Sequence, residues 1–232
     1  MLGHTHALSG GVAWLAAAPL VGHYAPGLTT HGYRELIAAV IVTAGTALLP
    51  DLDHPGSTIG QALGPLTAWL ARVVATATGG HRHGTHSILF AGAAGYGGWA
   101  LGSVGTRWAL PAIVVFAALA CAALGVTDTF AAAVLSCAAA GYVLVAGGAT
   151  IAWLGPAVAI GCAAHLLGDA LTERGVPLLW PLIPCRFRVG AVDTGSQVER
   201  LLIAPALVLA LIVLATHSAG WWTIAGLRAL AG

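Results

Sequence analysis

Residues 149–169 read ATIAWLGPAVAIGCAAHLLGD, a long apolar run that ends in a histidine and an aspartate. A helix that crosses a membrane needs roughly 17–25 mostly apolar residues. His165 and Asp169 stand four residues apart, so both side chains project from one face of such a helix. An unpaired ionised group at the end of an apolar run is costly. This stretch therefore predicts a membrane helix that carries a polar site at its end.

Further apolar runs on both sides of this stretch indicate that the chain crosses the membrane several times. We predict an all-α fold, a polytopic membrane helix bundle of about seven transmembrane helices, with six and eight as the alternatives. Residues 62–78 are interrupted by Arg72 and predict an amphipathic helix at the membrane interface. We treat residues 1–232 as one integral-membrane domain. The other predicted spans are Ala7–Val21, Leu36–Pro50, Ser87–Gly105, Trp108–Val126, Thr129–Gly147 and Leu201–Thr216.

The composition of the chain supports this class. Hydrophobic residues make up 58% and charged residues only 7%, whereas soluble domains are near 25% charged. The net charge is +1, so no basic field is present that would hold nucleic acid. The four cysteines form no CxxC pair, which argues against a disulfide framework or a thiolate zinc site. The expected partner is the lipid bilayer, and the sequence leaves the oligomeric state open.

Four polar clusters hold seven of the ten histidines, together with three aspartates. With two spans before Asp51 and four spans between His86 and His165, all four clusters fall at one face of the membrane. Imidazole combined with carboxylate suits Zn²⁺, Mn²⁺ or Fe²⁺. We therefore predict a site for one to three divalent ions, most simply zinc. The expected ligands are His6, Asp51, Asp53, His81, His86, His165 and Asp169, with His4 and His54 as weaker candidates.

The arginines indicate the orientation of this face. The side that bears the four clusters carries six arginines, and the opposite side carries Arg34, Arg107 and Arg228. Under the positive-inside rule the clusters face the cytoplasm. Residues 173–200, which contain three prolines, are expected to form a polar loop over the site.

At these residues the sequence resembles the YdjM-type family of bacterial inner-membrane proteins. The resemblance covers residues 4 to about 203 and implies a metal-dependent hydrolase in the bacterial inner membrane. The family itself looks distantly similar to zinc-dependent phospholipases C and single-strand nucleases. Residues 108–147 look longer than in compact members, which suggests an added helical hairpin, and His83 stands where the family usually has glycine. The matching blocks are Thr5-His6, Leu48–Pro55, His81-Arg82, Thr85–Ser87, His165 with Asp169, Gly175–Pro181, Arg186–Arg188 and Gln197–Arg200.

The leading hypothesis is a membrane-embedded metal-dependent hydrolase that acts on a phosphoester of a lipid or lipid-linked substrate. A metal-bound water loses its proton near neutral pH and can attack such an ester. Asp53 or Glu199 is the expected general base. Arg82, Arg186 and Arg188 are the expected ligands for anionic oxygens.

Two other classes stay open at this point. A membrane di-iron oxygenase also gathers histidines at one face, but it usually carries adjacent His-His pairs, which this sequence lacks. A metal transporter, or a regulatory membrane protein without enzymatic activity, is the second alternative. A transporter is expected to place ionisable residues near the middle of the bilayer, whereas the polar clusters here follow the ends of apolar runs.

Overall fold

The computed structural model describes residues 1–30, 32–62, 64–146, 150–183 and 185–230. These residues confirm the predicted all-α fold, since they form helices and, apart from two isolated bridges, no β-structure. The long helices are α1 (Gly3–Tyr24), α2 (Tyr33–Thr46), α4 (Pro65–Thr78), α5 (Ile88–Val104), α6 (Thr106–Ala123), α7 (Thr129–Ala146), α8 (Leu154–Ala170) and α9 (Ala204–Leu230). The short ones include η2 (Leu49–Asp53), α3 (Thr58–Gln61), η3 (Gly84–His86) and the π-helical η4 (Glu199–Ile203).

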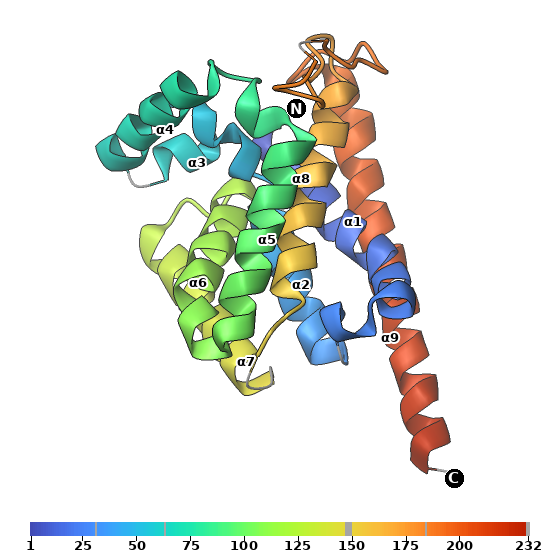
Figure 1. Cartoon of the computed structure of the whole chain (residues 1–232). Helices are drawn as coiled ribbons and strands as arrows, with labels where there is room; N and C mark the ends of the chain where they lie inside the picture. Colours follow the sequence, from blue (N-terminus) through green and yellow to red (C-terminus); the bar gives the residue numbers. More distant parts are fainter. Residues whose placement is uncertain (31, 63, 147–149, 184, 231–232) are drawn as a thin grey trace.

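Helices α2 and α8 form the centre of the bundle (Figure 1). Helix α8 packs between α5, α1 and α2, and α2 also contacts α6. Most residues of α8 are buried, whereas α9 runs along α1 at the outside of the bundle. Segment 108–147, predicted as an added hairpin, contains most of α6 and α7, which pack against each other.

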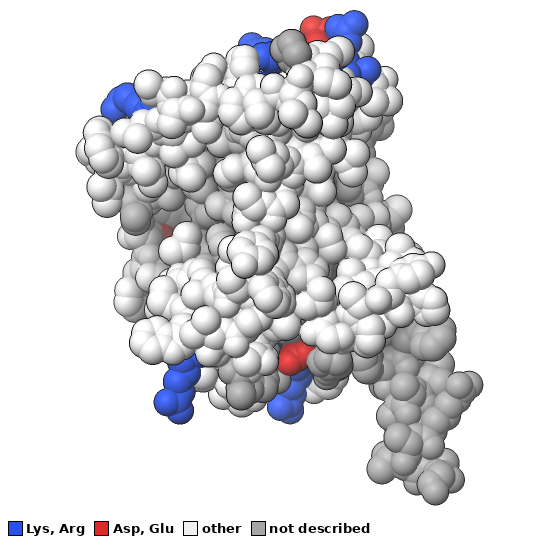
Figure 2. Space-filling view, viewed as in Figure 1, with Lys and Arg blue, Asp and Glu red and all other residues white. Residues whose placement is uncertain are grey.

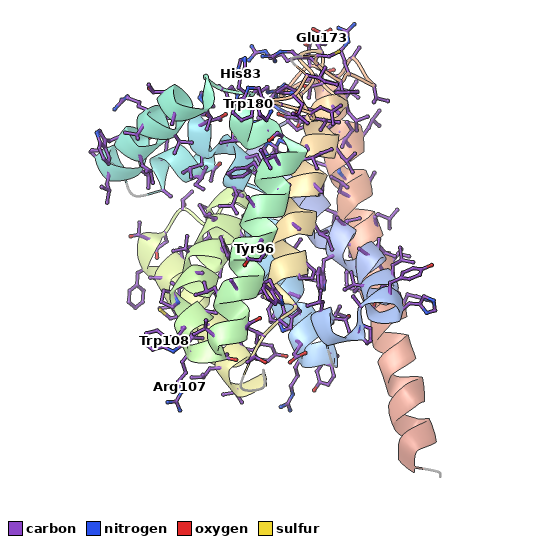
Figure 3. All side chains as sticks on the ribbon, in the orientation of Figure 1. His83, Tyr96, Arg107, Trp108, Glu173 and Trp180 are labelled. Atoms are coloured by element: carbon purple, nitrogen blue, oxygen red, sulfur yellow. The ribbon has the colours of Figure 1, made fainter. Side chains whose placement is uncertain are left out.

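Charged residues lie at the two ends of the bundle. On the face shown in Figure 2, arginine side chains gather at opposite ends, and the surface between them shows almost no charged atoms. Figure 3 places His83, Trp180 and Glu173 at one end and Arg107 and Trp108 at the other. This pattern is typical of a membrane protein, in which the apolar belt faces the lipid.

Only some of these helices are both long enough and apolar enough to be assigned as spans. Tyr33–Asp53, Thr106–Ala123 and Glu199–Ser218 are long and apolar enough to cross a membrane. Ile88–Val104, Thr129–Val145 and Leu154–Ala170 are apolar but shorter. The multi-pass bundle is thus supported, and the count of seven spans stays a prediction.

Helix α4 projects sideways from the end of the bundle that carries the N-terminus (Figure 1). Its inner side packs on η2 and buries Ala71. Leu66, Trp69, Leu70 and Val73 are exposed, and their spacing of three and four residues puts them on one face of the helix. This amphipathic form agrees with an interfacial helix, whose place in the membrane stays a prediction.

Small residues let the central helices approach closely, as is common in membrane bundles. Gly161 of α8 faces α2, and a Cβ atom at this position would lie 2.8 Å from the carbonyl oxygen of Thr43 and 3.0 Å from the nitrogen of Ala47. Because α8 sits this close, His165, one turn further on, reaches the carbonyl oxygen of Ala47 with its Nδ1 atom at 2.7 Å. Gly161 therefore sets the position of a candidate ligand.

The variant Gly161→Ala tests this packing. We expect it to destabilise the protein by about 1–3 kcal/mol, the usual range for overpacking a close contact. Gly141→Ala in α7 is the matched control, because a Cβ atom there meets no other atom within 4 Å. Thermal unfolding in detergent measures both variants, and equal melting temperatures for the two would contradict the proposed contact.

Candidate metal centre

The candidate ligands come from four segments that end at the same face of the bundle. His6 lies in the second turn of α1, and Asp51 and Asp53 lie on η2 directly after α2. His81 lies shortly before η3, and His86 is the last residue of η3, just before α5. His165 and Asp169 occupy the last turns of α8. The sequence pattern predicted this common face, and two groups of the predicted residues have ligand atoms within 4.8 Å of one another, Asp51-Asp53-His81-His86 and His6-His165-Asp169.

Four ligand atoms, two from each group, surround a common point. The Nε2 atoms of His86 and His165 are 3.3 Å apart. Oδ1 of Asp51 lies 3.6 Å from each of these nitrogens, and Oδ2 of Asp169 lies 3.7 Å from each. Ligands about 2.0–2.2 Å from a tetrahedral zinc ion stand about 3.3–3.6 Å apart. These five separations, between 3.3 and 3.7 Å, are close to those expected around one tetrahedral ion held by two imidazoles and two carboxylates.

The hydrogen bonds of the two histidines indicate which nitrogen of each ring is free. Nδ1 of His165 faces the carbonyl oxygen of Ala47, which only accepts, so this nitrogen donates. Nδ1 of His86 lies 3.1 Å from Oγ1 of Thr85 and 3.4 Å from Oδ2 of Asp53. In the neutral imidazole the proton on Nδ1 leaves a lone pair on Nε2. When both imidazoles are neutral, as metal binding requires, both Nε2 lone pairs point at the same place as the two carboxylate oxygens.

This arrangement concentrates acceptors in a buried place. His86 and His165 are fully buried, Asp169 is nearly so and Asp51 is partly buried. Burial by itself lowers the pKa of His86, but hydrogen bonding to the Asp51 and Asp53 carboxylates outweighs it and raises that pKa. Converging acceptors without a positive charge are unfavourable in a low-dielectric interior. The guanidinium of Arg82 supplies one positive charge at Oδ2 of Asp169, and a divalent cation would supply more.

Asp53 is placed to orient the neighbouring histidines. Its Oδ1 lies 2.8 Å from Nδ1 of His81. Its Oδ2 accepts from the backbone nitrogen of Arg82 at 3.1 Å and from the hydroxyl of Thr85 at 2.5 Å. A carboxylate that holds the outer nitrogen of a histidine fixes the tautomer and the ring orientation of a metal ligand. The contacts of Asp53 fit that role, and its predicted roles as general base and metal ligand stay predictions.

His6 lies on the other side of Asp169. Its ring stacks on that of His165 with 3.7 Å between centroids, and its Nε2 is 3.4 Å from Oδ1 of Asp169. Its Nδ1 is buried and has no hydrogen-bond partner among the described residues. Oδ1 of Asp169 also accepts from the backbone nitrogen of Met1 at 2.6 Å. Asp169 thus faces the four-atom set with one oxygen and His6 with the other.

Arg82 is a structural partner of Asp169. It is buried, and its Nη2 donates to Oδ2 of Asp169 at 2.8 Å while Nη1 donates to Oγ1 of Thr172 at 2.9 Å. Its backbone has a positive φ of 61°, a conformation that is uncommon for a residue with a side chain. The amide of Arg82 reaches Asp53 and its guanidinium reaches Asp169, so this one residue links the two ligand groups.

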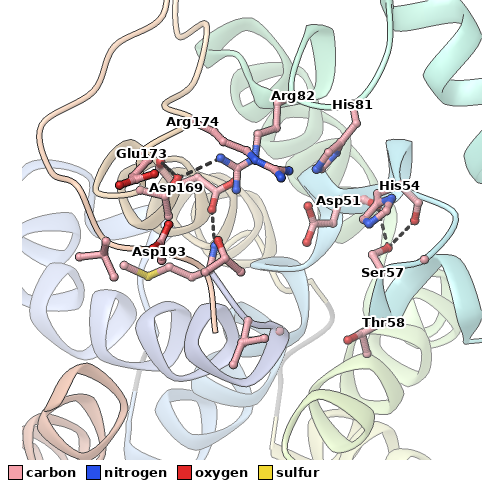
Figure 4. Close-up of a pocket in the computed structure, with 17 residues that line it drawn as sticks. Asp51, His54, Ser57, Thr58, His81, Arg82, Asp169, Glu173, Arg174 and Asp193 are labelled. Carbon is pink, nitrogen blue, oxygen red and sulfur yellow. Dashed lines mark hydrogen bonds and ion pairs between the residues drawn. The ribbon is translucent and has the colours of Figure 1, made fainter. Parts of the chain in front are cut away.

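A cavity of about 650 Å³ opens beside the four-atom set. Figure 4 shows Asp51, His54, His81, Arg82 and Asp169 on its wall, with Glu173, Arg174 and Asp193 of the polar loop opposite or beside them. His54 stacks on His81 with 4.6 Å between ring centroids. Burial and the neighbouring His81 lower the pKa of His54. The polar loop therefore borders a hollow that is lined by imidazole, carboxylate and guanidinium groups.

Several predicted residues lie away from this cavity. Glu199 is buried, and its two oxygens accept from the backbone nitrogens of Leu2 and Gly195 at 2.6 and 2.7 Å. Arg186 and Arg188 are exposed, and neither is among the described residues that line the cavity. His4 faces a separate groove beside α9. Within the described residues the structure thus brings His6, Asp51, Asp53, His54, His81, Arg82, His86, His165 and Asp169 together, but not these four.

The sequence analysis did not assign a role in the site to Thr85, Thr172 or Arg174. Thr85 stands next to His86, and a hydroxyl beside a candidate ligand is a signal for a hydrogen bond to that ligand or its neighbour. Arg174 follows Asp169 by five residues, and the sequence shows no reason to prefer it over the loop arginines. Only the path of the loop brings its side chain into the cavity.

Comparison with known proteins assigns the chain to a family. Residues 1–231 match the family described as YdjM inner membrane protein. The chain belongs to the YdjM family. The Inner membrane protein YdjM of Escherichia coli (strain K12) is 32% identical over 186 residues, which cover 76% of this chain and 65% of that relative. The protein of the same name from Shigella flexneri gives the same values.

The family assignment agrees with a multi-pass protein of the bacterial inner membrane. The chain spans slightly less than two thirds of the length of the curated YdjM relatives it matches. No solved structure matches the chain. The match to the YdjM family confirms the resemblance seen in the sequence blocks around His6, Asp51, His86 and Asp169.

The variant Thr85→Val tests the link between Asp53 and His86. Valine keeps the shape of threonine but removes the hydroxyl that joins Oδ2 of Asp53 to Nδ1 of His86. Because loss of such an outer contact typically weakens metal binding 10–100-fold, we expect zinc affinity to fall by about that factor. Thr85→Ser keeps the hydroxyl and is expected to bind as the unchanged protein does. A zinc titration against a chelator measures both, and equal affinity of the valine variant would contradict the assigned role.

Proposed function

We propose that this YdjM protein is a metal-dependent hydrolase of the inner membrane. The observation that carries the proposal is the set formed by Nε2 of His86, Nε2 of His165, Oδ1 of Asp51 and Oδ2 of Asp169, whose separations fit one tetrahedral ion. Such a donor set suits zinc, with manganese or iron as alternatives. The four protein atoms would fill a tetrahedral shell, so a water molecule would have to enter as a fifth ligand, a coordination number that zinc can reach. A divalent ion would acidify that water and polarise an ester oxygen. The cavity beside the set gives an ester room to approach.

The residues around the ion have separate tasks in this proposal. Asp53 contacts Nδ1 of His81 and Nδ1 of His86, and so holds each of these imidazoles in the tautomer that leaves Nε2 without a proton. Arg82 fixes Asp169 through the contact between its Nη2 and Oδ2 of that carboxylate. His54 lines the cavity and stacks on His81, so its imidazole is the proposed acceptor of the proton from the attacking water. A second ion beside His6 and Oδ1 of Asp169 would have to displace the nitrogen of Met1, which contacts that oxygen at 2.6 Å.

The proposed substrate is a phosphoester of a lipid or lipid-linked molecule. Arg174 lines the cavity and has no ion-pair partner among the described residues, so its guanidinium is free to bind a phosphate oxygen. The cavity lies at the end of the bundle beyond the apolar belt, where the headgroups of a bilayer begin. By the count of arginines on each side, this face is the cytoplasmic one.

Metal content tests the first half of the proposal. Protein purified in mild detergent and measured by elemental analysis is expected to hold one or more zinc ions per chain. His165→Asn is expected to lose metal, because its amide can still donate to Ala47 but no longer offers Nε2. His23→Ala, an exposed histidine outside both ligand groups, is the control. Equal zinc in both variants, with normal helical content, would refute the assignment.

Hydrolysis tests the second half. In detergent micelles containing anionic phospholipids, release of phosphate or headgroup is expected from the zinc-loaded protein. Arg174→Gln should raise KM about 10-fold or more, since a charge-assisted hydrogen bond contributes about 1.5–3 kcal/mol, and should leave the zinc content unchanged. Arg107→Gln, at the opposite end of the bundle, is the matched control. If the metal-loaded protein hydrolyses no lipid in a broad phospholipid panel, the phosphoesterase proposal fails.

A further inference from the structure

A second hollow of about 700 Å³ lies on the outside of the bundle beside α9, apart from the candidate metal centre. Its wall is apolar over most of its length. Leu8 of α1, Leu124 at the end of α6, and Ala204, Pro205, Val208, Leu209 and Ile212 of α9 form this wall. His4 and Arg200 stand at one end of it. We call this hollow the α9 groove.

The length of the α9 groove matches one leaflet of a bilayer. The stretch from Arg200 to Ile212 rises about 18 Å at about 1.5 Å per residue. Half of the hydrocarbon core of a bilayer is about 15 Å thick. Because most residues of the helix Glu199–Ser218 are exposed on the outside of the protein and the helix is apolar enough to cross a membrane, the groove lies in the acyl-chain region. One lipid chain running along α9 would fill its depth.

The polar end of the α9 groove carries the opposite charge to a phosphate group. Arg200 is exposed and has no ion-pair partner among the described residues. Arginine binds phosphate bidentately, and His4 stands beside it. An apolar channel one leaflet deep with an arginine at its polar end has the form of a phospholipid site.

The helix is also irregular at this point. Residues Glu199–Ile203 form a π-helical turn directly before α9. Pro205 lacks the amide hydrogen that an α-helix would direct at the preceding turn, which accounts for the break. Such π-turns are frequent at functional sites. Here the turn places the carboxylate of Glu199 towards the interior and Arg200 towards the groove.

The groove and the metal cavity are separated by the first turn of α1. Leu2 and Gly3 line the cavity, and His4 and Leu8 line the groove. Glu199, next to Arg200, holds the backbone of Leu2 through a 2.6 Å hydrogen bond. A lipid whose chain lies in the groove therefore carries its headgroup to within one helical turn of the cavity.

We propose that the α9 groove binds one acyl chain of a phospholipid and that Arg200 and His4 hold its phosphate-bearing end beside the metal cavity. The proposal rests on the proposed function in one respect: it identifies the substrate of that site as a phospholipid of the leaflet on the side of the cavity. Binding of lipid in the groove itself does not depend on catalysis.

Photolabelling of the full-length protein tests the groove. The protein is placed in nanodiscs that contain phosphatidylglycerol with a diazirine on one acyl chain, irradiated and mapped by mass spectrometry. We expect labelling to concentrate on residues 204–212. Val208→Trp, which fills the groove, should reduce this labelling at least fivefold with unchanged zinc content. Val213→Trp, an exposed position on α9 outside the groove, should leave the labelling as it is.

The headgroup contact has its own test. Arg200→Gln should abolish the preference of the labelling for phosphatidylglycerol over an equally labelled phosphatidylcholine. Labels spread evenly around α9, or reduced equally by both tryptophan variants, would show only the surrounding bilayer lipid and overturn the groove. Groove labelling in a protein that binds zinc but hydrolyses no lipid would refute the phosphoesterase and leave the groove standing. Hydrolysis of lipid without labelling in the groove would refute the groove and leave the phosphoesterase standing.

Discussion

The structure depends on one constraint, the close approach of two imidazole nitrogens and two carboxylate oxygens in a buried place. His86 and His165 both turn their free Nε2 atoms towards Asp51 and Asp169. The outer nitrogens are occupied by Ala47 and by the Thr85–Asp53 pair. Acceptors that converge in this way repel one another unless a positive charge lies between them. The surrounding contacts are arranged to keep the four atoms facing each other.

The helix packing delivers this geometry from distant parts of the chain. Glycine at position 161 lets α8 approach α2, which brings His165 to the end of α2 and to η2 behind it. Helix α4 packs on the outer side of η2, so a helix with an exposed apolar face supports the segment that carries Asp51. Arg82 then joins η2 and α8 through its backbone and its guanidinium. The helix with the exposed apolar face and the candidate metal ligands are therefore connected through η2 and Arg82.

Much of this could be predicted from the sequence because periodicity and hydropathy are local properties. The apolar runs predicted the helices, and an even number of spans between His86 and His165 predicted that their clusters share a face. The individual role of each clustered residue could not be predicted. Asp53 and Glu199 are both acidic residues in conspicuous motifs, yet Asp53 orients histidines and Glu199 accepts from two backbone amides. That difference is set by tertiary hydrogen bonds, which spacing does not encode.

The most direct test of the central claim is X-ray absorption spectroscopy of the zinc-loaded protein in detergent. The four-atom set predicts a zinc edge with about four nitrogen or oxygen neighbours at about 2.0–2.1 Å and the multiple-scattering signal of two imidazoles. The same spectrum should change to fewer imidazoles in His86→Gln. A six-coordinate oxygen shell without imidazole scattering would place the ion elsewhere and contradict the account.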